Sequence, residues 1–248
     1  MFPAIGVALV FALLMCWHVV RSGRELYWLF IILFLQPLGA LVYFCLIVLP
    51  ELIGGPAARR AGGEARRRLD PERGYREAKA RLEGADTVAN RMKLAEAAME
   101  LGRYDEAESL YARSLSGVHA DDPALLLGRA RALVELGRSA EALDVLHRLG
   151  EAGDAGRTAQ SALLMARAHH ALGQLREADT AYGWAAGRLP GLEGLARYAA
   201  FLAETRRDAE ARETMEEIDR RHAKTAAHFR REANHWRAFA AERVTTAR

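Results

Sequence analysis

The chain of 248 residues has little cysteine and little lysine, and the shortage of cysteine excludes two classes of domain. Its two cysteines, Cys16 and Cys45, both lie inside long apolar runs. Two residues so placed provide neither a disulfide framework nor a CxxC zinc site. If the runs form an antiparallel hairpin, the cysteines lie roughly 20 Å apart in depth, which is beyond disulfide reach. We therefore expect two free thiols in apolar surroundings.

The chain also lacks a large excess of charge of one sign. Its formal net charge is +3. Residues 51–68 alone carry +3 and residues 1–50 carry +1, which leaves −1 for residues 69–248. A large domain without a positive field is not expected to bind nucleic acid.

Common catalytic motifs are absent as well. The sequence contains no phosphate-binding loop, dinucleotide-binding glycine motif, nucleophile elbow or His-Glu-x-x-His zinc motif. His169 and His170 are adjacent, and neighbours on a helix point about 100° apart, so they cannot easily face one metal ion. We expect neither an enzyme nor a cofactor or metal site.

Two apolar runs fill the first 50 residues. Phe2–Val20 and Leu26–Leu49 are each interrupted by a single polar residue. About 20 apolar residues are needed to cross a bilayer as a helix, so both runs qualify. Because the connection Arg21–Glu25 is short, we predict a two-helix transmembrane hairpin over residues 1–50. A cleaved signal peptide is disfavoured, since the first run lacks a basic start and an A-x-A site.

The second run carries a resemblance to a known family. Residues 28–44, with Trp28, Pro37 and Tyr43, resemble the N-terminal two-helix membrane segment of the phospholipase D type cardiolipin synthases. The resemblance covers roughly residues 5–48 and implies a membrane anchor in a setting near lipid metabolism. It does not imply that family's chemistry, because its His-x-Lys-x4-Asp motif has no complete copy here.

A basic segment with two Gly-Gly pairs, residues 51–69, is typical of a flexible linker. The positive-inside rule places it and all that follows in the cytoplasm. The arginine-rich, lysine-poor composition is associated with GC-rich bacteria, which indicates a bacterial inner membrane. The cluster either provides this topology signal alone or also binds anionic lipid headgroups, at about 1 kcal/mol per arginine. Its arginines are Arg59, Arg60, Arg66, Arg67 and Arg68.

The rest of the chain is organised around a repeated turn. Leu101–Ala107 recurs as Leu136–Ala142 and Leu172–Ala178, with a more divergent copy at Thr205–Ala211. The intervals of 35, 36 and 33 residues are close to the roughly 34 residues of a helix-turn-helix repeat. Over about residues 87–220 the array resembles the tetratricopeptide repeats.

That resemblance implies small residues at repeat positions 8 and 20, glycine at 15 and a large side chain at 24. The fourth copy has Arg206 where glycine is expected. We predict an all-α fold, in which residues 70–86 form an N-terminal capping helix, residues 87–220 a TPR-like α-solenoid of four repeats, and residues 221–248 a C-terminal capping helix. A capping role for the last helix is preferred to a dimerisation role.

Arrays of this kind bind partners on the concave face formed by the first helix of each repeat. Arg131 and Arg167 are the expected anchors, and they either bind a partner or pair with neighbouring glutamates. The carboxylate clamp of chaperone-binding family members is missing, since Met92 and Glu96 stand at its positions. The predicted groove consists of Met92, Glu96, Met99, Leu127, Arg131, Glu135, Gln160, Leu163, Arg167, His170, Glu193 and Glu204.

These expectations define a membrane-anchored scaffold that binds a protein or peptide partner in its groove and lipids through its hairpin and basic linker. The alternative is an accessory factor in phospholipid or cell-envelope biogenesis that acts through the hairpin. An enzyme is disfavoured, because no catalytic site is recognisable.

Overall fold

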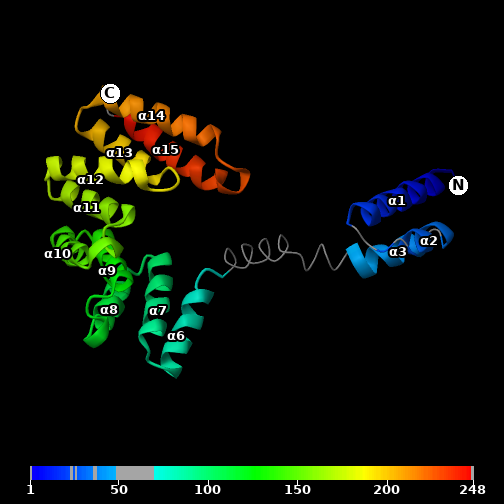
Figure 1. Ribbon diagram of the computed structural model, residues 1–248, viewed down its shortest axis with the longest axis horizontal. Coiled ribbons are helices and arrows are strands. Elements are labelled where there is room, and N and C mark those ends of the chain that lie inside the picture. Colours follow the sequence, from blue (N-terminus) through cyan, green and yellow to red (C-terminus); the bar gives the residue numbers. More distant parts are fainter. Residues whose placement is uncertain (1, 23–24, 26, 36–37, 49–69, 247–248) are drawn as a thin grey trace. The chain divides into compact units, whose positions relative to one another are not determined.

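The computed structural model describes residues 2–22, 25, 27–35, 38–48 and 70–246, with residues 2–8 described by their backbone alone. All the regular structure in these ranges is helical (Figure 1). The chain divides into two compact units, Met1–Arg73 and Gly74–Arg248, and each is considered by itself. The predicted linker, including Arg59, Arg60, Arg66, Arg67 and Arg68, lies outside the described residues.

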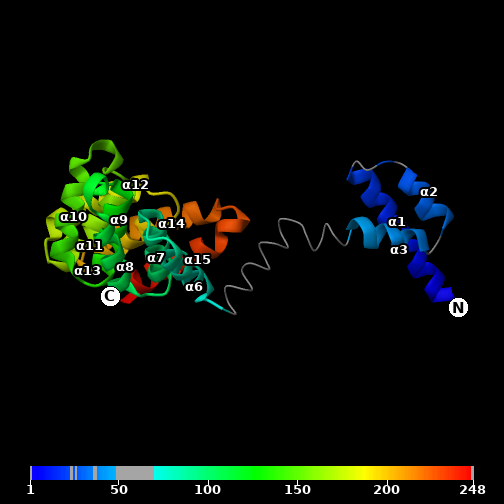
Figure 2. The same cartoon turned by 90° about the horizontal axis from the view of Figure 1, so that it is seen from below.

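The first unit has a small core of its own. In it α1 lies against both α2 and α3 (Figure 2). Val19, Ile32 and Tyr43 are fully buried between them, and the Tyr43 hydroxyl lies 3.1 Å from His18 Nδ1. The helices of this unit are α1 (Phe2–Arg21), α2 (Tyr27–Phe34), α3 (Leu38–Tyr43) and the π-helix η1 (Phe44–Val48).

The second apolar run differs from the single helix that was predicted for it. It is divided into α2, α3 and η1. The interval between α2 and α3 contains Pro37 in the sequence, and proline has no backbone N–H to donate. Gly39 N donates to the Leu35 carbonyl at 2.7 Å. A Cβ on Gly39 would lie 2.0 Å from the Ile31 carbonyl oxygen, so glycine is required at this close approach.

The two predicted membrane spans are not confirmed by the fold. No helix in the described ranges is both long and apolar enough to cross a membrane. Gln36, which interrupts the second run, lies outside these ranges.

The second unit is an all-helical solenoid, in agreement with the predicted fold class. Figure 1 follows its helices in order from α6 in cyan to α15 in red. Helices α7 to α14 form four consecutive packed pairs, and α15 packs on both members of the last pair. The helices are α6 (Arg73–Gly84), α7 (Val88–Glu100), α8 (Tyr104–Ser114), α9 (Pro123–Glu135), α10 (Ser139–Glu151), α11 (Ala159–Ala171), α12 (Leu175–Arg188), α13 (Glu193–Glu204), α14 (Asp208–Ala223) and α15 (Arg230–Thr246), with 3-10 turns η2 (Gly117–His119), η3 (Gly153–Ala155) and η4 (Ala227–Phe229).

Alanine allows the two helices of each pair to approach closely. The alanines at repeat positions 8 and 20 all have an exposed fraction of 0%. A larger side chain at any of them would meet a neighbouring backbone or side chain in a core packed without spare volume. These alanines are Ala95, Ala107, Ala130, Ala142, Ala166, Ala178, Ala199 and Ala211.

The turn within each pair has the same left-handed geometry. Gly102, Gly137 and Gly173 have φ angles of 72°, 74° and 72°. Arg206 adopts this conformation too, with φ 61°. In the first turn Arg103 N donates to the Ala98 carbonyl at 2.9 Å, and the three later turns repeat this bond, as in a Schellman C-cap.

Candidate functional site

A cavity of about 340 Å³ opens between the first helices of the second and third repeats and the end of the array. We call it the central cavity. Helices α9 and α11 form one wall, and the α12–α13 connection, α13 and α15 form the other. It is lined by Leu127, Arg131, Glu135, Gln160, Leu163, Leu164, Arg167, Leu189, Pro190, Glu193, Arg197 and Glu232.

The predicted groove residues are only partly brought together. Leu127, Arg131, Gln160, Leu163 and Arg167, with the flanking glutamates of α9 and α13, line the central cavity. The structure places them there because successive first helices, α9 and α11, pack side by side.

The predicted residue His170 lies in a neighbouring side cavity of about 240 Å³. This side cavity shares Arg167 and Arg197 with the central cavity. His170 Nε2 lies 3.3 Å from Glu204 Oε2, and its imidazole ring meets the Phe201 ring edge-on at 5.0 Å.

The three predicted residues of the first repeat lie elsewhere. Met92 and Met99 are half-buried against the core of that repeat, and Glu96 is exposed. None of the three lines the central or the side cavity. The two unbranched thioether chains bend onto the core instead of standing free in the groove.

The two expected arginine anchors have different surroundings. Arg167 donates to Glu135 at 2.8 Å across adjacent repeats, which is the pairing considered as an alternative to partner binding. Arg131 is exposed, and within the described ranges it has no ion-pair partner within 4.0 Å. Of the two expected anchors, Arg131 is therefore the one whose guanidinium has no direct ion pair to give up to a ligand.

Glu135 is held in its charged form by this cluster. Burial by itself would raise the pKa of its carboxyl group, but the hydrogen bond and charge of Arg167 outweigh burial, and the charges of Arg197 and Arg131 add to them. The pKa of Glu135 consequently lies below its usual value. Arg167 is thus the direct partner of this half-buried carboxylate, and Arg197 and Arg131 act on it through their charge alone.

The C-terminal helix contributes directly to the site. The Arg197 guanidinium stacks over the Trp236 ring of α15 at 4.9 Å while donating to Glu193 at 2.9 Å. Glu232, also on α15, lines the central cavity and is exposed. A cation over an aromatic face is stabilised by the ring's negative potential, so α15 orients Arg197 as well as capping the array.

Sequence reasoning missed Arg197 and Glu232. Arg197 stands at position 6 of its repeat, outside the positions that usually face the groove. Glu232 belongs to a helix predicted only to cap the array, and nothing in its sequence indicated that it would reach the concave face.

Comparisons with known proteins agree with the architecture of the second unit. The tetratricopeptide repeat family profile matches residues 98–163, which extend from the end of α7 into α11. A solved structure, "MamA 41-end from Desulfovibrio magneticus RS-1", aligns with 64% of this chain and 89% of its own at 19% identity and a TM-score of 0.52. Another, "MamA RS-1 ArsTM double mutant", aligns with 63% and 87% at 19% identity and a TM-score of 0.49. No curated protein matches the chain.

These matches define the class of the fold. The profile match and the MamA structure support a solenoid of tetratricopeptide repeats, the fold class of protein-interaction scaffolds. At 19% identity the structural likeness concerns the fold alone. None of the matches supports the resemblance of residues 5–48 to the cardiolipin synthases, nor the role in phospholipid biogenesis that it implied.

Proposed function

We propose that this chain is a protein-interaction scaffold that holds a segment of a partner protein in the central cavity. The observation that carries the proposal is Arg131, an exposed cation on the central cavity without an ion pair among the described residues, whereas the other two arginines of the cavity, Arg167 and Arg197, are already paired. A partner's carboxylate that pairs with Arg131 would have to displace only water. At Arg167 it would first have to displace Glu135.

Crosslinking of the full chain in its native membrane extract tests this proposal. A photo-reactive amino acid at Gln160, on the cavity wall, should capture a partner from the wild-type background. Arg131→Glu should abolish that capture. Arg176→Glu is the matched control, because the Arg176 side chain is 91% exposed on α12 and lies outside the cavity. Equal capture by all three proteins would reject the central cavity as the site.

We further propose that the first unit attaches the scaffold to a membrane. Large apolar side chains cover its surface: Phe34 is 79% exposed, Leu33 and Val20 66%, and Phe30 65%. Monomeric soluble proteins rarely expose apolar surface so densely. Immersion in lipid would remove this surface from water at about 25 cal/mol per Å².

Membrane attachment is measured by flotation of the chain with phospholipid vesicles. The full chain should float, and a chain without residues 1–50 should stay in the dense fraction. Changing the arginines at 59, 60, 66, 67 and 68 to glutamine in the full chain separates the lipid-headgroup role from simple attachment. Flotation of the shortened chain would place the lipid contact in the repeats. Protease added to right-side-out vesicles should spare the repeats if they are cytoplasmic.

A further inference from the structure

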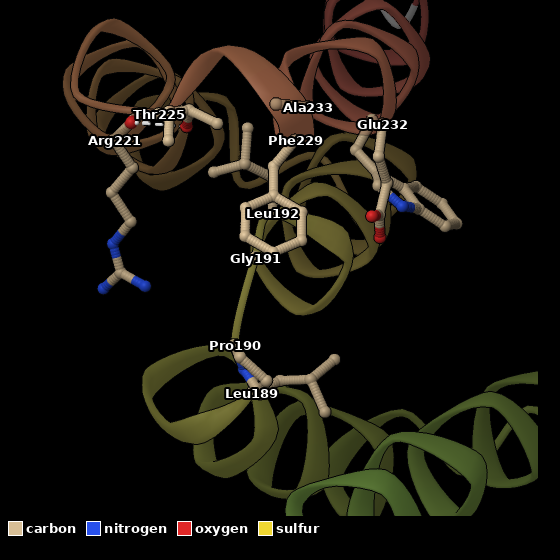
Figure 3. Close-up of a pocket in the computed structure, with 11 residues that line it drawn as sticks. Leu189, Pro190, Gly191, Leu192, Arg221, Thr225, Phe229, Glu232 and Ala233 are labelled. Carbon is tan, nitrogen blue, oxygen red and sulfur yellow. Dashed lines mark hydrogen bonds between the residues drawn. The ribbon is translucent and has the colours of Figure 1, made fainter. Parts of the chain in front are cut away.

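A third pocket lies beside the central cavity, and we call it the loop pocket. It has a volume of about 590 Å³ and lies between the α12–α13 connection and the junction of α14 with α15. Figure 3 shows Leu189 and Pro190 on one side and the ring of Phe229 facing the open space from the other. Phe229 is 58% exposed, so an apolar ring stands uncovered at the centre of the pocket.

The loop pocket and the central cavity share a wall. Leu189, Pro190 and Glu232 line both. Arg131 lines only the central cavity, and Phe229 only the loop pocket. One chain segment crossing Leu189 and Pro190 would therefore meet Arg131, Glu232 and Phe229 in this order.

The charges along this path alternate. Arg131 is a cation and Glu232 an anion, and across the described residues neither has an ion-pair partner within 4.0 Å. The other charged residue of the loop pocket, Arg221, donates to Glu217 at 2.7 Å and is already engaged. The uncommitted groups are thus one guanidinium, one carboxylate and one aromatic ring.

We propose that the scaffold recognises a peptide segment of its partner in which an acidic residue, a basic residue and an apolar residue follow one another along this path. The acidic side chain pairs with Arg131 and the basic one with Glu232. The apolar side chain enters the loop pocket against Phe229, Leu192 and Pro190. This inference rests on the proposed function and adds to it the chemistry of the bound segment.

Short synthetic peptides test the order of recognition. Each carries one Glu, one Lys and one Phe separated by Gly-Ser spacers of several lengths, and a second series exchanges Glu and Lys. Fluorescence anisotropy measures their binding to the full-length chain in mild detergent. The wild type should bind the Glu-Lys-Phe series at least ten-fold more tightly than the exchanged series. The double variant Arg131→Glu/Glu232→Lys should reverse this preference, which a general loss of folding could not do.

The loop pocket is tested separately by Phe229→Ala, whose exposed site leaves the cores intact. This variant should weaken the Glu-Lys-Phe peptide roughly ten-fold, as expected for partial burial of one aromatic side chain. It should not change binding of the same peptide with Phe replaced by Gly. Equal effects on both peptides, or no effect on either, overturn the assignment of the loop pocket. If Arg131→Glu still abolishes partner crosslinking, the proposed function stands without it.

Discussion

At the scale of single residues, the array depends on a few positions with no freedom of size or conformation. Gly137 adopts a left-handed φ of 74° and has open space where a Cβ would lie, so its requirement for glycine comes from the backbone alone. Gly128 is the reverse case, because a Cβ there would lie 2.5 Å from Cζ of Tyr111. The first glycine serves a turn and the second a close contact between repeats.

Gly137→Ala should destabilise the array by about 1 kcal/mol, because a Cβ disfavours the left-handed conformation. Arg206→Gly should instead stabilise the array, since Arg206 already adopts the left-handed conformation, at φ 61°, and glycine adopts it without strain. Gly187→Ala is the control in a helical segment with open space, and should stabilise by up to about 1 kcal/mol. Urea unfolding midpoints followed by circular dichroism distinguish the three, and a stabilising Gly137→Ala would contradict the role of the turn.

Gly128→Ala should destabilise by about 1–3 kcal/mol although alanine is the better helix former, because the methyl group overpacks against Tyr111. Shortening the opposing side chain removes the clash, so Tyr111→Leu should cost less in the Gly128→Ala background than in the wild type. A double-mutant cycle of unfolding free energies measures this coupling. Additive effects would mean that the ring moves aside freely.

At the scale of helices, α15 closes the array and completes the site. Its Ala233 and Ala240 are buried in the core that it forms with α13 and α14. The same helix provides the Trp236 ring under Arg197 and the Glu232 carboxylate of both pockets. Packing of this helix and the geometry of the proposed binding surface are therefore coupled.

Ala240→Asp should destabilise the last repeat by about 3 kcal/mol or more, because it buries a charge without a partner. Ala238→Asp, two positions away on the exposed face of the same helix, has an equal change in helix propensity and should cost no more than about 0.7 kcal/mol. Hydrogen exchange of the α13 and α14 amides measures the difference. Similar protection in both variants would show that α15 does not stabilise the array.

The ion pair between α9 and α11 gives the array a dependence on pH. Since the folded-state pKa of Glu135 is depressed, its contribution to stability is present above the unfolded pKa of about 4.3 and is lost as the pH falls through the folded pKa. Arg167→Gln should therefore lower the thermal midpoint at neutral pH, and the deficit should shrink below about pH 4. Arg176→Gln, at a pair whose side chains are 91% and 45% exposed, should show a much smaller deficit. A deficit independent of pH would exclude Glu135 as its source.

At the scale of the whole molecule, the two units present different surfaces. The repeat unit buries its apolar side chains in consecutive cores from α6 to α15. The first unit has its own small core and leaves many large apolar side chains exposed. This difference motivates the proposal that the repeats act as a scaffold and the first unit as an attachment segment.

A chain of residues 70–248 should therefore fold by itself. Its thermal unfolding midpoint by circular dichroism should agree with that of the full chain in the same detergent, because each repeat is stabilised by its sequence neighbours. A midpoint lowered by several degrees would show that the first unit stabilises the repeats.

Much of the solenoid was determined by the sequence itself. The interval between the turns and the spacing of alanines depend on contacts within and between adjacent repeats, which are local in sequence. For this reason the first helices begin at Val88, Pro123, Ala159 and Glu193, where the spacing of the motif predicts repeats that start at Val88, Pro123, Ala159 and Leu192. The sequence showed Arg206 where glycine is expected, and the structure shows that Arg206 nevertheless adopts the left-handed conformation, with φ 61°.

Only the tertiary structure decided which groups meet in the central cavity. The pairing of Arg167 with Glu135 depends on side-chain geometry between adjacent repeats, which the motif does not specify. The entry of α15 into the cavity lined by α9 and α11 depends on packing between helices distant in sequence. The same holds for the second apolar run, where composition indicated one helix and the chain forms α2, α3 and η1. Hydrophobicity determines that a segment is removed from water. How its helices are arranged depends on contacts such as the close approach of Gly39 to the Ile31 carbonyl.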